Sequence, residues 1–361
     1  MRSSIVPSVM VAALALAAPA AAQLGTQITK GAQQLKQAHD ELTITDAEEK
    51  QIGSDISAKL RDKYGVVQDP AIHKYVTLVG SVLAQASSRP TLDWTFIVLD
   101  TDGVNAFAAP GGFVHITRGA LALIQNEAEL ADVLGHEISH VTEKHTINAI
   151  KKEKAVSATA SASRNQLLQD VANAGYSMVL ENHYDRSQEK DADRLGVTLA
   201  NKVGYAPTGL SAFLARLADR NKNLKEPSGL FASHPETQDR IDTLGKLIPA
   251  QKLTATAAVA ARYHASVVFK PVAVDSLGTV AAPSSSSDAS KSSGGGGSGG
   301  KFGLGGLNPL GNQKTGNQTI ASAGSRGVNP DRDAKGGPNK GLVVVTVTPA
   351  EVAEFKKGIS S

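Results

Sequence analysis

The residues best placed to do chemistry form one short pattern, His136-Glu137-Ile138-Ser139-His140. Within a helix, side chains four residues apart project from the same face about one turn apart, so both imidazoles can reach one metal ion. Glu137 then lies beside the ion, where its carboxylate can accept a proton from a water molecule. Because zinc lowers the pKa of such a water to about 7, the pattern predicts hydrolysis without an activated serine or cysteine. Two ordinary histidines on a helix surface would give the same spacing.

A catalytic zinc site needs a third protein ligand and one open position. The metzincin pattern does not supply it, because Thr146 stands where that pattern has its third histidine and Glu143 replaces the required glycine. On a continuous helix His145 is rotated by more than a third of a turn from His140, so we expect it on the helix surface or supporting a ligand. The third ligand must therefore lie elsewhere in the sequence.

Glu189 and Asp193 are the downstream candidates, because they stand four residues apart on one predicted helix. Glu189 would bind the metal. Asp193 could accept a hydrogen bond from a ligand histidine and so hold its tautomer and orientation. A solvated, charged helix face would show the same spacing.

The elements around these residues predict an α+β fold that is mainly α, with a small sheet. Asn126 and Glu129 are spaced as the capping residues of the helix that carries the two histidines. Apolar residues at helical spacing and β-branched runs give the remaining elements. Helices are predicted at 45–65, 70–86, 164–203 and 208–217, and strands at 94–99, 112–117 and 263–274.

The strand that begins at Gly112 is also a candidate substrate site. A free edge of this strand could pair with the backbone of an extended peptide while the scissile carbonyl reaches the zinc. An interior strand is the other interpretation of the same residues. The residues proposed for the substrate edge are Gly112, Phe113, Val114 and His115.

Both ends of the chain differ in composition from its middle. Residues 1–22 have the charge, apolar centre and small-residue cleavage site of a secretory signal, so we expect export to the periplasm. Residues 277–340 are rich in Ser and Gly and predict a disordered linker. The expected organisation is a signal peptide at 1–22, a polar helix or extension at 23–42, the main domain at 43–276, this linker, and a short strand-helix element at 341–361.

Composition excludes several classes of function. The formal net charge is +3, and no basic run interleaved with aromatic residues accompanies it, so we expect no nucleic-acid partner. The chain has no cysteine, which excludes disulfides, thiolate ligands and cysteine nucleophiles. Once the signal is removed, no remaining stretch is apolar enough to predict an integral membrane segment.

Four segments in order make the chain resemble a known family. They are Asn105–Gly112, Leu134–Val141, Glu189–Asp193, and Ser233–Pro235 followed by Arg240-Ile241. From about residue 47 to residue 247 the chain is similar to the zinc metallopeptidases that include the CAAX prenyl endopeptidases, the HtpX heat-shock membrane protease and soluble periplasmic relatives.

The resemblance implies a zincin-like domain of the gluzincin type with one Zn²⁺ per chain, bound by His136, His140 and Glu189. It also implies that Glu137 is the general base and that Asp193 supports a ligand histidine. His234 and Arg240 are candidates to lie near the open zinc position, where they could donate to the oxyanion, or His234 could occupy that position at rest. Capping of a helix by Ser233 and His234 is the alternative.

The leading hypothesis is therefore an exported zinc metalloendopeptidase, either free in the periplasm or peripheral to a membrane, that acts on unfolded or misassembled proteins. The transmembrane helices of the membrane-bound relatives are missing, which favours soluble or periplasm-facing substrates. A zinc-bearing chaperone or binding protein with little cleavage is the alternative, and a hydrolase of cell-wall peptides is a third hypothesis. The sequence leaves the oligomeric state open.

Overall fold

The computed structural model describes residues 44–154, 163–181, 184–222, 237–273 and 341–359. The chain divides into two units, and the sheet and the histidine pair belong to the unit that comprises Asp46–Ile150 and Ala162–Ser361. Of the other unit, Met1–Thr45 and Lys151–Ser161, only residues 44–45 and 151–154 are described. The predicted signal peptide, the extension at 23–42 and the linker at 277–340 lie outside the described residues, as does His234.

Three strands form one small sheet in the order β1-β3-β2. They are β1 (Thr95–Leu99), β2 (Ala106–Ala109) and β3 (Phe113–Thr117). Strand β3 pairs in parallel with β1 and antiparallel with β2, so it is the central strand. Between β2 and β3 the short 3-10 turn Pro110–Gly112 reverses the chain, with Gly111 at a φ of 73° that favours glycine.

Helices make up most of the described chain and confirm the prediction of a mainly α fold with a small sheet. Their N-termini follow ordinary capping chemistry: Asp69 caps α3 ahead of Pro70, and the side chain of Asn126 accepts from the backbone N–H of Glu129 to cap α5. The helices are α2 (Asp46–Tyr64), α3 (Pro70–Ala86), α4 (Arg118–Leu123), α5 (Glu127–Thr142), α6 (His145–Lys154), α7 (Arg164–Glu181), α8 (Arg186–Val203), α9 (Gly209–Asn221), α11 (Thr237–Ala250), α12 (Ala260–Ser266) and α13 (Pro349–Lys357).

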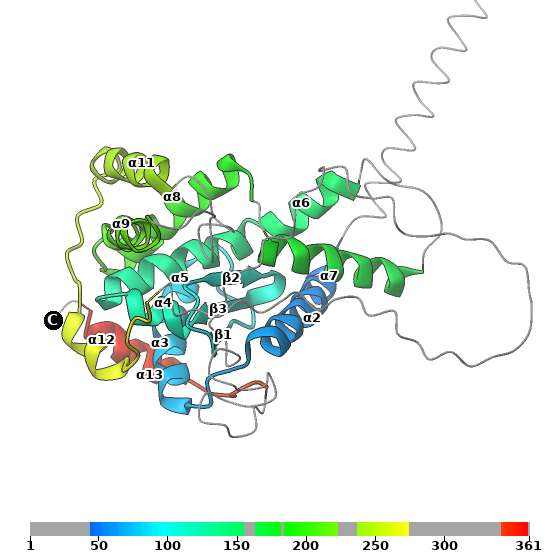
Figure 1. Cartoon of the computed structure of the whole chain (residues 1–361), viewed down its shortest axis with the longest axis horizontal. Helices are drawn as coiled ribbons and strands as arrows, with labels where there is room; N and C mark the ends of the chain where they lie inside the picture. Colours follow the sequence, from blue (N-terminus) through cyan, green and yellow to red (C-terminus); the bar gives the residue numbers. More distant parts are fainter. Residues whose placement is uncertain (1–43, 155–162, 182–183, 223–236, 274–340, 360–361) are drawn as a thin grey trace, which may run out of the picture. The chain divides into compact units, whose positions relative to one another are not determined.

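Helix α5 is at the centre of the fold. It contacts β2 and β3 of the sheet, helix α3, and the helices α8 and α9, so it lies between the sheet and the α8–α9 pair (Figure 1). Nearly all of its residues are buried, including the charged ones. A helix that is buried all round must have partners for its polar side chains, and this is the setting of the His136–His140 pair.

Two glycines bring α5 and α8 close together. A Cβ added at Gly135 would come within 2.7 Å of the carbonyl oxygen of Gly196, and one at Gly196 would come within 2.5 Å of the backbone N of His136. No larger residue fits at either position without moving a helix backbone. The contact places the start of α8, which carries Glu189, against the middle of α5.

Several predicted elements are wrong in type or extent. The predicted helix 164–203 is two helices, because Asp185 caps a new helix with a full capping box together with Gln188. Of the strand predicted at 263–274, the described residues 263–273 form no strand, since α12 covers their start and Tyr263 is buried in that helix. Residues 342–347 belong to no strand or helix, so the strand-helix element predicted at the C-terminal end is a segment without regular secondary structure followed by α13.

The substrate-edge prediction is also wrong. Because β3 lies between β1 and β2, both of its edges are already paired along Phe113, Val114 and His115. His115 is fully buried, and its ring contacts the Ser57 hydroxyl at 2.9 Å and the carbonyl oxygen of Phe107 at 3.3 Å. Gly112 belongs to the turn before the strand. None of the four residues presents a free edge.

Within the described segments, no helix is both long enough and apolar enough to cross a bilayer.

Candidate metal centre

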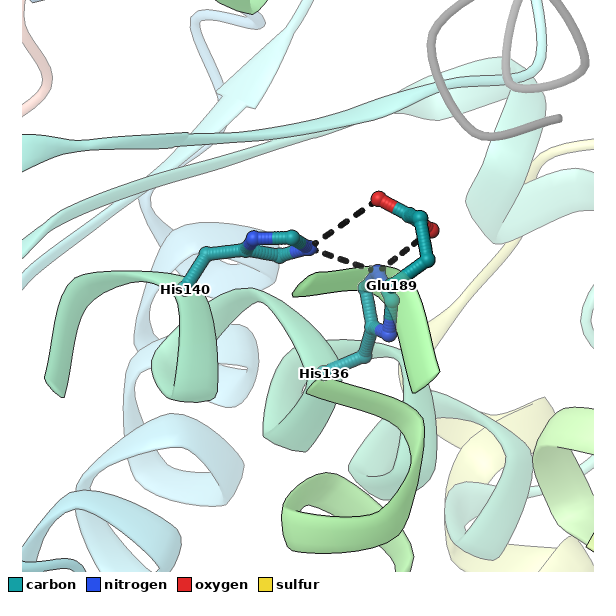
Figure 2. A group of neighbouring side chains, drawn as sticks. All are labelled: His136, His140 and Glu189. Atoms are coloured by element: carbon teal, nitrogen blue, oxygen red, sulfur yellow. Dashed lines mark hydrogen bonds and ion pairs between the residues drawn. The ribbon is translucent and has the colours of Figure 1, made fainter. Parts of the chain in front are cut away.

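His136 and His140 lie one turn apart on α5, and Glu189 reaches them from the first turn of α8 (Figure 2). The Nε2 atoms of the two histidines are 3.0 Å apart. The carboxylate oxygens of Glu189 lie 3.7 Å from Nε2 of His136 and 3.5 Å from Nε2 of His140. One possible ligand atom from each of the three residues therefore forms a corner of one small triangle. These three atoms lie within 4.8 Å of one another.

This donor set fits a zinc ion. Four ligand atoms placed tetrahedrally at roughly 2.0–2.2 Å from Zn²⁺ would be about 3.3–3.6 Å apart, and the observed separations lie around that range. The three side chains are almost completely buried, at 3%, 1% and 3% exposure. Two imidazole nitrogens at this distance either share a proton or direct both lone pairs at a bound cation, and the buried carboxylate beside them favours a cation.

Asp193 and Arg240 lie behind the triangle. Oδ1 of Asp193 is 2.8 Å from Nδ1 of His136, the nitrogen that faces away from Glu189. Arg240, from α11, donates through Nε to one oxygen of Asp193 at 2.8 Å and through a terminal nitrogen to the other at 2.6 Å. Its remaining terminal nitrogen lies 3.2 Å from Glu189. The guanidinium considered above as an oxyanion donor is thus turned toward two carboxylates.

Burial and pairing act in opposite directions on these charges. Burial raises the pKa of Asp193, but the nearby Arg240 and the hydrogen bond from His136 outweigh it and hold the pKa below its ordinary value. Burial likewise lowers the pKa of Arg240, and the charges of Asp193 and Glu189 more than reverse that effect. Both groups are therefore ionised throughout the neutral range.

Glu137 is on the same helix and is also buried, at 1% exposure. Its charge contributes to the raised pKa of Arg240 and to that of Tyr184, so it lies near both. The tyrosine was missed by sequence reasoning. Its ring stacks on that of His140 with 3.8 Å between centroids, and no spacing or motif marks it, since it precedes α8 as an isolated residue.

Comparison with known proteins identifies the region that holds this site. The family model described as "Peptidase family M48" matches residues 70–248, which include all three residues of the triangle. Residues 70–248, just under half of the chain, are therefore similar to an M48 metallopeptidase domain. This confirms the coarser part of the family prediction, while the relation to CAAX prenyl endopeptidases and to HtpX in particular stays a prediction.

Three relatives of the M48 region are informative. A Vibrio cholerae protein described as a candidate beta-barrel assembly-enhancing protease is 31% identical over 211 residues, which are 55% of this chain and 44% of the relative. The mitochondrial metalloendopeptidase OMA1 of Schizosaccharomyces pombe is 27% identical over 210 residues, 56% of this chain and 61% of the relative. The metalloprotease YcaL of Escherichia coli is 26% identical over 245 residues, 63% of this chain and 92% of the relative. The matched part of the chain spans less than half of the Vibrio cholerae relative.

Proposed function

We propose that this chain is a zinc metalloendopeptidase that hydrolyses peptide bonds of exported proteins. The observation that carries the proposal is the buried triangle of His136, His140 and Glu189 inside the M48 region, with Glu137 on the same helix. A purely structural zinc site is closed by four protein ligands, and no fourth His, Asp or Glu joins this group among the described residues. The overall domain is taken to be zincin-like on the same grounds.

The chemistry divides between the ion and the protein. Zinc, when bound by the three side chains, acts as a Lewis acid on the scissile carbonyl and lowers the pKa of water. Glu137 accepts the proton of the attacking water and returns it to the leaving amine. Its carboxylate sits one residue after the first ligand, so the geometry of α5 fixes its position relative to the triangle. His234, as an oxyanion donor or a resting ligand, stays part of the proposal.

Asp193 and Arg240 prepare the ligands instead of contacting the substrate. A carboxylate at Nδ1 of His136 keeps the proton on that nitrogen and leaves the Nε2 lone pair facing the triangle. Arg240 balances the charge of both carboxylates in a buried site and holds the pKa of Asp193 below its ordinary value. We therefore assign Arg240 a positioning role.

The substrate is proposed to bind along β2, which replaces β3 as the candidate edge. Among the described strands β2 pairs only with β3, so one of its edges is not used within the sheet, although the side chains of its four residues are buried. The end of β2 adjoins the site, because Ala108 and Ala109 line a small hollow together with His140. An extended peptide added to this edge would gain backbone hydrogen bonds beside the zinc.

The proposed setting is protein quality control in the periplasm. The predicted signal at 1–22 supports export, and the similar proteins include one described as a beta-barrel assembly-enhancing protease and one described as a mitochondrial metalloendopeptidase. Unfolded or misassembled proteins are the proposed substrates, because an extended backbone is what an edge strand can bind.

The decisive experiment uses the chain from Gln23 onward with casein as substrate. We expect cleavage that a chelator abolishes and that added zinc restores. Glu137→Gln should bind zinc normally but lose at least about 100-fold in turnover, the usual contribution of a general base, whereas His140→Ala should lose the metal itself. Zinc binding without cleavage by the wild-type chain would instead support the chaperone hypothesis, and cleavage that persists in Glu137→Gln would remove that residue from the mechanism.

A further inference from the structure

The side chain of His145 contacts that of His140, although the two residues do not lie on one continuous helix. Helix α5 ends at Thr142, and the chain turns at Lys144, whose φ of 54° is rare for a residue with a side chain. Helix α6 then starts at His145. This turn redirects the chain, so the rotation expected for one continuous helix does not apply.

The contact between the two rings is direct. Nδ1 of His145 lies 3.0 Å from Nδ1 of His140, within hydrogen-bond distance. His145 is buried at 6% exposure, and its own carbonyl oxygen accepts a hydrogen bond from Gln188, the neighbour of Glu189 on α8, at 3.4 Å. The face of His140 is covered by Tyr184, whose hydroxyl contacts that of Thr146 on α6 at 2.9 Å.

The direction of this hydrogen bond follows from the metal site. Nε2 of His140 faces Nε2 of His136 and the carboxylate of Glu189, so it must offer its lone pair if it is to bind a cation. A neutral imidazole carries its one proton on the other nitrogen, and Nδ1 of His140 is therefore the donor. The acceptor is Nδ1 of His145, which must itself be neutral with its proton on Nε2.

We propose that His145 is a positioning residue for the metal centre: it accepts the Nδ1 proton of His140 and so fixes the tautomer and orientation of that ligand. The proposal rests on the proposed function, since it requires His140 to be a ligand. The two ligand histidines then differ in the group that accepts the proton of their Nδ1 atom. His136 is backed by the carboxylate of Asp193, whereas His140 is backed by a neutral ring that adds no charge to the site.

The test compares substitutions that differ in one acceptor atom. Asparagine can place its amide oxygen where His145 has Nδ1, whereas leucine has a similar size and no acceptor. We expect His145→Leu to weaken zinc binding by about 10–100-fold, the usual effect of losing a partner of a ligand histidine, and His145→Asn to restore most of it. Affinity is measured by competition with a chromophoric chelator, and His264→Phe, which removes an exposed histidine outside the site, is the matched control.

Kinetics separate positioning from folding. At saturating zinc we expect His145→Leu to lower kcat with little change in KM, because substrate contacts are intact. Unfolding temperatures of the metal-free variants report any purely structural effect. If His145→Leu and His145→Asn are equally destabilised and both bind zinc as the wild type does, the proposal is wrong.

A measurement on the wild-type chain avoids any folding defect of the variants. In the zinc-loaded protein labelled with ¹⁵N-histidine, we expect His140 to carry its proton on Nδ1 and His145 to carry its proton on Nε2. A proton on Nδ1 of His145 would overturn the proposal. Failure of the wild type to bind zinc, or unchanged binding in His140→Ala, would instead count against the proposed function.

Discussion

Arg240 brings a positive charge into a buried site that otherwise contains the carboxylates of Glu137, Glu189 and Asp193. In the metal-free protein the guanidinium is the cation that these groups face. Removing one member of a buried ion pair is costly because the remaining charges keep their desolvation penalty without compensation. At the scale of residues, the stability of the site therefore depends on a group to which we assign a positioning role.

We predict that Arg240→Leu lowers the free energy of unfolding of the metal-free protein by about 3–5 kcal/mol. Zinc should reduce this loss, because a bound dication compensates part of the same negative charge. The measurement is urea unfolding with and without a chelator. Arg194→Leu breaks an exposed pair with Asp191 and should cost less than about 1 kcal/mol, so equal losses in the two variants would contradict this account.

At the scale of elements, the close crossing of α5 and α8 joins the two parts of the metal centre. Gly135 and Gly196 lie at the crossing, where each leaves room only for the backbone of the other helix. The first turn of α8 can then bring Glu189 to the two imidazoles. The separation of the helices therefore decides the size of the ligand triangle.

Gly196→Ala tests this dependence. Its Cβ would lie 2.5 Å from the backbone N of His136, so we expect the helices to separate at a cost of about 1–3 kcal/mol in unfolding free energy. Zinc affinity should fall as well, since Glu189 moves with α8. Both quantities are measured by denaturant unfolding and by chelator competition.

The matched control is Gly245→Ala in α11. A Cβ at Gly245 meets nothing within 4 Å, so this change should stabilise the helix by about 0.5–1 kcal/mol and leave zinc binding unchanged. A zinc affinity in Gly196→Ala equal to that of this control would show that the crossing does not set the ligand geometry.

At the scale of the whole molecule, the C-terminal helix α13 packs on the domain that carries the site. Val352 of α13 is buried, and Phe355 lies edge-on to Tyr75 of α3 with 6.1 Å between ring centroids. Arg262 links this contact to α5, because its guanidinium stacks 3.9 Å from the Phe355 ring and also pairs with Glu127 at the start of α5. Helix α13 thus adds a buried apolar side chain to the hydrophobic core that α3 and α5 share.

We predict that ending the chain after Lys340 lowers stability. At least the burial of Val352 is lost, on the order of 1.5–3 kcal/mol, and Tyr75 and Arg262 lose a partner. Thermal unfolding of the zinc-loaded chain measures the effect. Deleting residues 291–320, within the segment that the sequence predicts to be a linker, is the control and should leave the unfolding temperature unchanged. Equal shifts would contradict a specific role for α13.

The sequence by itself determined the local part of this protein. The period of one helix fixes the relative positions of His136, Glu137 and His140. The side chain of Asn126 caps the start of that helix, so neither feature depends on distant contacts. The mainly α class with a small sheet follows from the same local patterns. Glu189 could be nominated by spacing and by family resemblance, because its partner four residues on is a carboxylate.

Only the tertiary structure decided the relative positions of residues that lie on separate elements. Only the α5–α8 crossing brings Glu189 to the histidines, and only the packing of α11 turns Arg240 toward Asp193. The order of strands placed β3 in the middle of the sheet, and the turn at Lys144 placed His145 on His140. Strand order and chain reversals are set by the packing of distant segments and by single backbone angles, which leave no periodic signal in a sequence.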